Sequence, residues 1–99
     1  MKYLKKYESI DESKIGDYVI CNDNNLEVGE FIKNNIGQII NISYGIHYYI
    51  KYDNIPDDIK KYFNDSMPDV RMMFREEVIH FSENKEKLKL LVTANKYNL

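Results

Sequence analysis

Between residues 46 and 52, apolar and polar side chains alternate strictly along the chain. One set of alternate positions is Ile46, Tyr48, Ile50 and Tyr52, and the other is His47, Tyr49 and Lys51. Successive side chains of a strand point to opposite faces of a sheet, so this pattern predicts a strand in a sheet that is covered on one side. We expect the face with Ile and Tyr to be the core face.

The neighbouring residues predict that this strand is the second half of a hairpin. Residues 36–43 are rich in Ile, and Tyr44-Gly45 marks a turn between the two runs. Further β-rich runs predict strands at residues 16–21, 70–74 and 78–81. The polar residues 22–25 favour turns and end the first of these runs, and a loop is expected from there to about residue 35.

Two helices are predicted from capping signals and helical spacing. Pro56 with acidic residues behind it resembles a helix start, which predicts a short inserted helix at about residues 56–64. Ser82 has the side chain of an N-cap for a final helix at about residues 83–95. Its apolar side is expected to comprise Leu88, Leu91 and Val92.

The order of these elements predicts a single domain of the mainly β (α+β) class. No linker or internal repeat divides residues 15–99, and residues 1–14 are read as a tail or a short helix. The strand and helix phases place one set of side chains in a common core, namely Ile20, Ile39, Ile50, Phe81 and Leu91.

Two segments, Ile15-Gly16-Asp17-Tyr18-Val19 and Ile36-Gly37-Gln38-Ile39, resemble strand starts of SH3-like barrels of the KOW type. The resemblance covers about residues 15–81 and implies a small five-stranded SH3-like barrel with a short inserted helix and a C-terminal helix. KOW modules that contact RNA usually offer basic loops, whereas the corresponding loop here, residues 22–30, is acidic and rich in amides. This difference argues against carrying RNA binding over to this chain.

The chain as a whole also resembles small uncharacterised proteins of bacteriophages. The resemblance lies in the opening Met1-Lys2-Tyr3-Leu4-Lys5-Lys6-Tyr7, in Asn54-Ile55-Pro56 and Phe81-Ser82-Glu83-Asn84-Lys85-Glu86, and in the ending Lys96-Tyr97-Asn98-Leu99. It implies a viral accessory protein, a class that includes inhibitors of host defence. It transfers no functional residue.

Net charge and cysteine content limit the classes of partner and the cellular compartment that we expect for this protein. The 14 basic and 16 acidic side chains leave a net charge of -2, so no general field attracts the protein to nucleic acid or anionic lipid. Cys21 is the only cysteine, and no apolar stretch is long enough for a signal peptide or a membrane span. We therefore expect a cytoplasmic protein, in the host cell if it is viral, with no membrane partner.

No residue pattern predicts catalysis, a cofactor or a metal site. His47 and His80 are the only histidines, and neither stands at a metal-binding spacing from Cys21. The paired acids at residues 57–58 and 76–77 fall on a helix start and a turn, where carboxylates usually point to water. We expect Cys21 to be a buried structural residue and the protein not to be an enzyme.

The candidate binding site is the strip of His47, Tyr49 and Lys51, which lies off the expected core face. Tyrosine is common on binding surfaces and aromatic rings stack on nucleobases, although the terminal helix or a second subunit could equally cover this face. The leading hypothesis is a non-enzymatic binding module that sequesters a host protein or a small nucleotide ligand, as a homo-oligomer with Tyr49 at the subunit contact. The alternatives are a KOW-like nucleic-acid-binding barrel and a small nucleotide-processing enzyme.

Overall fold

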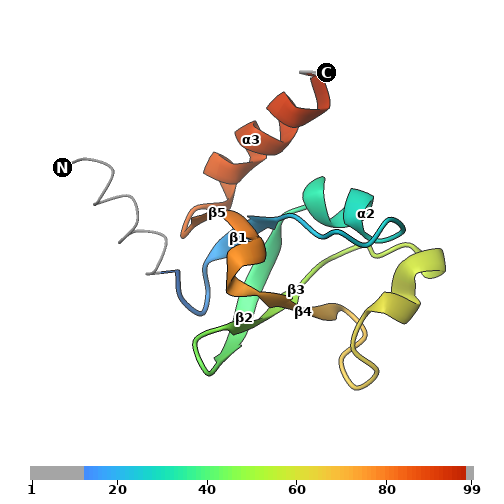
Figure 1. Ribbon diagram of the computed structural model, residues 1–99. Helices are drawn as coiled ribbons and strands as arrows, with labels where there is room; N and C mark the ends of the chain where they lie inside the picture. Colours follow the sequence, from blue (N-terminus) through green and yellow to red (C-terminus); the bar gives the residue numbers. More distant parts are fainter. Residues whose placement is uncertain (1–12, 98–99) are drawn as a thin grey trace.

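The computed structural model describes the backbone of residues 13–97 and the side chains of residues 13–93. It shows a five-stranded antiparallel sheet in the order β4-β3-β2-β1-β5, together with a few helices (Figure 1). The strands are β1 (Tyr18–Cys21), β2 (Gly37–Ser43), β3 (His47–Lys51), β4 (Val70–Phe74) and β5 (Val78–Ser82). The five predicted strands are therefore confirmed, with small shifts at their ends.

The sheet is not closed into a barrel in the part of the chain that the structure describes. β4 and β5 are its two edges, and each pairs with one neighbour, β4 with β3 and β5 with β1. A 3-10 turn, η2 (Arg75–Glu77), connects the end of β4 to the start of β5. Because this connection is so short, Phe74 and Val78 can be at most roughly 14 Å apart in space. The short turn holds these ends near each other without forming a ladder between the strands. The architecture shown is a small α+β domain with an open sheet.

The predicted hairpin is formed by β2 and β3. Tyr44 and Gly45 have φ values of 57° and 71°, and positive φ at both central positions is what a type I′ turn requires. Ile39 lies opposite Ile50 across the two strands, and a bulge follows Ile39. The turn therefore sets the register that places one side of β3 in the core.

The main core lies on the face of the sheet covered by helix α2 (Gly29–Lys33) and the 3-10 helix η1 (Asp57–Tyr62). Tyr48, Ile50 and Tyr52 are almost fully buried there, which confirms the predicted core face, whereas Ile46 at the start of β3 is 44% exposed. The other buried members of this core are Val19, Cys21, Val28, Ile32, Ile39, Ile59, Phe63 and Met73. Of the residues predicted to share one core, Ile39 and Ile50 are buried in this core and Phe81 is partly buried against it, whereas Ile20 is buried outside it.

Helix α2 lies in the segment that the sequence predicted to be a loop, so that prediction was wrong. Oδ1 of Asn25 accepts hydrogen bonds from the backbone N–H groups of Glu27 and Val28, at 2.8 and 3.0 Å, and this holds the turn that leads into the helix. Val28 and Ile32, one helical turn apart, are fully buried. A five-residue helix is too short to show a hydrophobic period, so the turn-forming residues before it dominated the prediction.

The predicted inserted helix is present as a 3-10 helix. Its hydrogen bonds span three residues, as from the Ile59 N–H to the Pro56 carbonyl at 3.2 Å. The buried side chains of Ile59 and Phe63 anchor it to the core.

The C-terminal helix α3 (Lys85–Tyr97) begins two residues later than predicted. Its cap is Asn84, whose Oδ1 accepts a hydrogen bond from the Glu86 N–H at 2.9 Å. The predicted cap Ser82 accepts instead from the Asn84 N–H at 2.9 Å, within the turn before the helix. Both side chains thus satisfy backbone donors, but the nearer one begins the helix.

Helix α3 lies over β1 and β5, on the opposite face of the sheet from α2. Leu88 of α3 and Ile20 of β1 are buried outside the main core cluster, which gives this corner a small core of its own. Leu91 was predicted to be buried, but it is 39% exposed. The prediction failed because α3 extends away from the strands toward its C-terminal end (Figure 1).

The predicted tail or short helix at residues 1–14 lies outside the described residues, apart from Ser13 and Lys14. The Ser13 hydroxyl lies 3.1 Å from the Tyr48 hydroxyl, so the chain is joined to the sheet at this point. In the described part of the chain, no helix combines the length and the apolar character that crossing a membrane requires.

Candidate functional site on the open face of the sheet

The three predicted site residues project from the same face of β3, opposite the main core. Among the described helices, α3 packs on this face mainly over β1 and β5, which leaves the part made by β2, β3 and β4 largely uncovered. We call this part the open face. His47 and Tyr49 are half-buried on it, and Lys51 is exposed.

One end of the open face carries an aromatic cluster that extends beyond the predicted strip. The strand register places Phe74 opposite His47 and Met72 opposite Tyr49, so side chains of β4 continue the surface that β3 begins. We define the aromatic cluster as Tyr44, His47, Tyr49, Met72 and Phe74.

Within the aromatic cluster, the His47 ring pairs with the rings of Tyr44 and Phe74, while a large part of the cluster's surface stays exposed. The ring centroids of His47 and Phe74 are 5.5 Å apart, and those of His47 and Tyr44 are 6.4 Å apart. Tyr44 is 90% exposed, Phe74 43% and Met72 39%. Ring pairs of this kind hold the side chains in place, so the cluster forms a defined apolar surface that faces solvent.

Lys51 lies at the other end of the open face, away from the aromatic cluster. It is four positions after His47, or roughly 13 Å along a strand. The register places it in a row with Gln38 and Tyr18 across β3, β2 and β1. Its Nζ is 3.2 Å from an oxygen of Asp53 and 3.5 Å from one of Asp69, and a hydrogen bond to Asp53 is the main reason that the pKa of Lys51 is raised. The predicted strip therefore divides into two separate surfaces, one with His47 and Tyr49 in the aromatic cluster and one with Lys51 beside Asp53 and Asp69.

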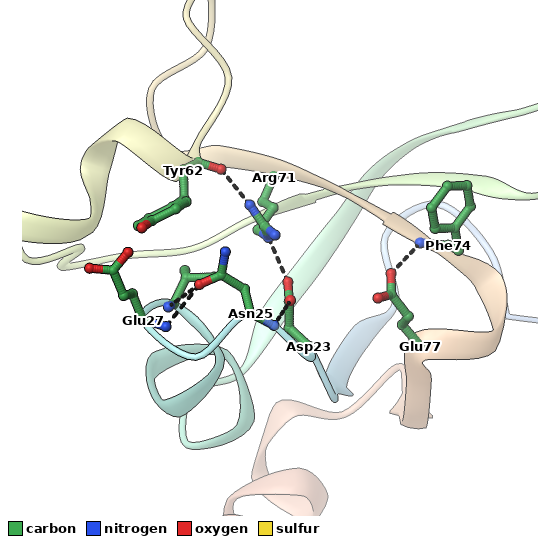
Figure 2. A network of polar contacts seen from close by, with 8 residues as sticks. Asp23, Asn25, Glu27, Tyr62, Arg71, Phe74 and Glu77 are labelled. Carbon is green, nitrogen blue, oxygen red and sulfur yellow. Dashed lines mark hydrogen bonds and ion pairs between the residues drawn. The ribbon is translucent and has the colours of Figure 1, made fainter.

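A largely buried ion pair holds β4, which carries Met72 and Phe74 of the aromatic cluster, against the rest of the fold. Nε of Arg71 donates to Oδ2 of Asp23 at 2.7 Å, and Nη1 of Arg71 donates to the Tyr62 carbonyl at 2.5 Å (Figure 2). The side chains of Arg71 and Asp23 are only 20% and 7% exposed. The guanidinium thereby joins β4 to η1 and to the loop after β1.

A second contact fixes the end of β4 beside Phe74. The backbone N–H of Phe74 donates to Oε1 of Glu77 at 2.8 Å, across the η2 turn (Figure 2). The same turn is closed by the Arg75 N–H, which donates to the Ile46 carbonyl at 3.0 Å. These backbone contacts determine where Phe74 leaves the strand and therefore keep its ring next to His47.

The only thiol is directed away from this site. Cys21 is fully buried on the core face, and burial raises its pKa to about 12. The nearby Tyr52 hydroxyl is buried as well, and burial raises the pKa of Tyr52 well above its usual value. Both histidines belong to the other face, since His47 lies on the open face and His80 pairs with Ile20. The fold thus separates Cys21 from His47 and His80.

Cys21 is expected to resist thiol reagents in the folded protein, because it is fully buried and its thiolate is strongly disfavoured. With an aromatic disulfide reagent at mildly alkaline pH, the native chain should release almost no chromophore, and the chain in guanidinium chloride should release one equivalent. Rapid labelling of the native chain would contradict the position of Cys21 in the core.

Among the described residues, no group of three or more His, Cys, Asp or Glu side chains is arranged to hold a metal ion. Sequence reasoning found His47 and Tyr49 but missed Tyr44, Met72 and Phe74. The alternation of Met72 and Phe74 in the run 70–74 was a usable signal for one face of a strand. The pairing of that strand with β3, which brings the two sets together, has no signal in a single sequence.

Comparisons with known proteins add no assignment. No family model matches the chain, and no curated protein or solved structure shows significant similarity to it.

Proposed function

We propose that this protein is a non-enzymatic binding module that captures a partner protein on its open face. The observation that carries this proposal is the aromatic cluster, in which rings from β3, β4 and the hairpin turn pair with one another and remain exposed. Tyr, Phe and Met are enriched at protein interfaces, where they supply large contact areas. A partner with an apolar surface would remove this cluster from water.

The charge distribution favours a protein over nucleic acid as the partner. Lys51, the cation of the predicted strip, lies at the other end of the open face and is already paired with Asp53 and Asp69. Surfaces that bind single-stranded nucleic acid combine stacking rings with cations along the phosphate backbone. The net charge of -2 likewise gives no long-range attraction to phosphates. The aromatic cluster thus matches an interface with protein better than a platform for bases.

An SH3-like arrangement of the sheet is part of the same proposal. Its support is the strand order, which places β1 between β2 and β5, together with the short η2 turn between the two edge strands. Gly37 supports the close packing that such a small sheet needs, because a Cβ at this position would collide with Cγ2 of Ile50 and the ring of Tyr52. The resemblance of the Gly16-Asp17 strand start to KOW modules points in the same direction.

The biological setting that we propose is a viral accessory protein that sequesters a component of the host cell. This setting rests on the resemblance of the whole chain to small bacteriophage proteins. It agrees with a small domain that exposes an aromatic cluster suited to contact with a partner protein. Self-association through Tyr49 is the alternative use of the same surface, and the experiment that follows separates the two.

Phe74→Glu is expected to abolish capture of the partner, because it places a carboxylate at the centre of the aromatic contact. Tagged wild type, Phe74→Glu and Ile79→Glu would be incubated with bacterial lysate, and retained proteins would be quantified by mass spectrometry. Ile79 is a matched control, since it is a 50% exposed apolar residue on the opposite edge strand. A protein retained by wild type and Ile79→Glu but lost with Phe74→Glu is the expected result.

Light scattering on the same proteins, with Tyr49→Glu added, decides whether the partner is a second copy. A wild-type mass of one 11.8 kDa chain at micromolar concentration excludes self-association as the use of this surface. A larger mass that falls to one chain in Tyr49→Glu would replace the proposed partner with a second subunit. Equal retention of every protein by wild type and Phe74→Glu, with a monomeric wild type, would contradict the proposal.

A further inference from the structure

A polar, partly open cavity lies beside α3, near the Lys51 end of the sheet and away from the aromatic cluster. Its volume is about 320 Å³, and it is lined by residues of α3, of the segment after α2 and of the segment after β3. Its polar lining includes Asn34, Asn35, Asp53, Asn54, Lys85 and Lys89. This volume is at the lower end of the range for small-molecule sites.

The two lysines give this cavity a positive charge that is available to a ligand. Nζ of Lys85 lies 5.8 Å from the centroid of the Tyr18 ring, and no carboxylate of the described residues forms an ion pair with it. Lys89 pairs with Glu86 at 3.1 Å, but both side chains are more than half exposed, so the pair is weak and can be exchanged for another anion. The one carboxylate of the lining, Asp53, already pairs with Lys51.

The amide side chains of the lining offer acceptors. Nδ2 of Asn34 donates to the Glu30 carbonyl at 2.9 Å, and Nδ2 of Asn35 donates to the Phe31 carbonyl at 2.8 Å. These bonds cap the end of α2 and fix both amides, so that their Oδ1 atoms remain as acceptors. Amide oxygens accept hydrogen bonds from hydroxyl groups. The cavity therefore combines cations on α3 with acceptors on the facing segment.

We propose that this cavity binds a small phosphate ester that carries free hydroxyl groups, of the size of a nucleoside monophosphate. The phosphate lies between Lys85 and Lys89, and hydroxyl groups of the sugar donate to Asn34 and Asn35. Lysines four residues apart on a helix project from one face, so both ammonium groups can reach one phosphate. This site is independent of the partner surface, since it shares no residue with the aromatic cluster.

Isothermal titration calorimetry with adenosine monophosphate as the probe tests this site. Lys85→Gln and Lys89→Gln are each expected to weaken binding about tenfold, because each removes a charged contact to phosphate. Lys87→Gln is the matched control, with the same chemical change on the same helix at an exposed position outside the cavity lining. Added sodium chloride should weaken binding to the wild type.

Three further measurements complete the test. Ribose phosphate should bind and adenosine should not, because the proposed contacts are to phosphate and sugar. Amide chemical-shift changes on adding adenosine monophosphate should centre on residues 34–36 and 85–93. Adenosine binding as tightly as its monophosphate, equal affinities for Lys85→Gln and Lys87→Gln, or no heat with any of the phosphates at millimolar concentration would each overturn the proposal.

Discussion

Replacing Ile50 with Ala is expected to lower the free energy of unfolding by about 2 to 5 kcal/mol. Ile50 is a fully buried member of the main core. It lies opposite Ile39 of β2, on the face of the sheet that α2 and η1 cover. Truncation removes three methyl or methylene groups, and the surrounding strands are hydrogen-bonded on both sides of β3 and can relax little into the space. Chemical denaturation followed by circular dichroism measures the change.

Ile46→Ala is the matched control for this experiment. The chemical change is the same and the residue directly precedes β3, but its side chain is 44% exposed. We expect a loss of less than about 1 kcal/mol, because little transfer energy and no cavity are involved. Similar denaturation midpoints for the two variants would contradict the assignment of the core face.

Replacing Arg71 with Met is expected to destabilise the fold by about 3 kcal/mol, within the range for removing one partner of a buried ion pair. The change leaves the Asp23 carboxylate, which is 7% exposed, without its partner at 2.7 Å, and it leaves the Tyr62 carbonyl without its donor. The unpaired carboxylate is the larger cost, because the site excludes most of the water that could solvate it. Thermal and denaturant unfolding measure the loss.

Two further variants identify the buried charge as the cause. Adding Asp23→Asn to Arg71→Met should recover part of the stability, because a neutral amide is less costly to bury than an unpaired carboxylate. Lys60→Met, which removes the exposed pair of Lys60 with Asp57, should change stability by less than about 1 kcal/mol. No recovery in the double variant would show that Arg71 acts through packing or through the Tyr62 carbonyl.

The ion pair also connects stability to the proposed binding surface. Arg71 is the neighbour of Met72 on β4, and their side chains lie on opposite faces of that strand. The guanidinium holds the inner side of β4, while the outer side presents Met72 and Phe74. A loss of partner capture in Arg71→Met would therefore reflect displacement of the strand, so Phe74→Glu remains the direct test of the surface.

Sequence patterns predicted the strands and the core face of β3 because these depend on neighbouring residues. Alternation over residues 46–52 is a direct consequence of strand geometry, and Gly45 tolerates the positive φ value that the turn requires there. Helix α2 was missed because its stability comes from burying Val28 and Ile32 in the core. Leu91 was placed wrongly because helical periodicity gives the phase of a helix but not the direction in which it leaves the sheet.

The same distinction between local pattern and tertiary structure applies to the candidate sites. The sequence by itself determined that His47, Tyr49 and Lys51 share a face, since side chains two residues apart on a strand must do so. Only the tertiary structure decided that Phe74 joins His47, that Lys51 belongs to a different neighbourhood, and that Lys85 lies over Tyr18. These arrangements depend on strand pairing and on the docking of α3, which bring together residues far apart in the chain. The free energy of such contacts is spread over the whole core, so no local pattern records it.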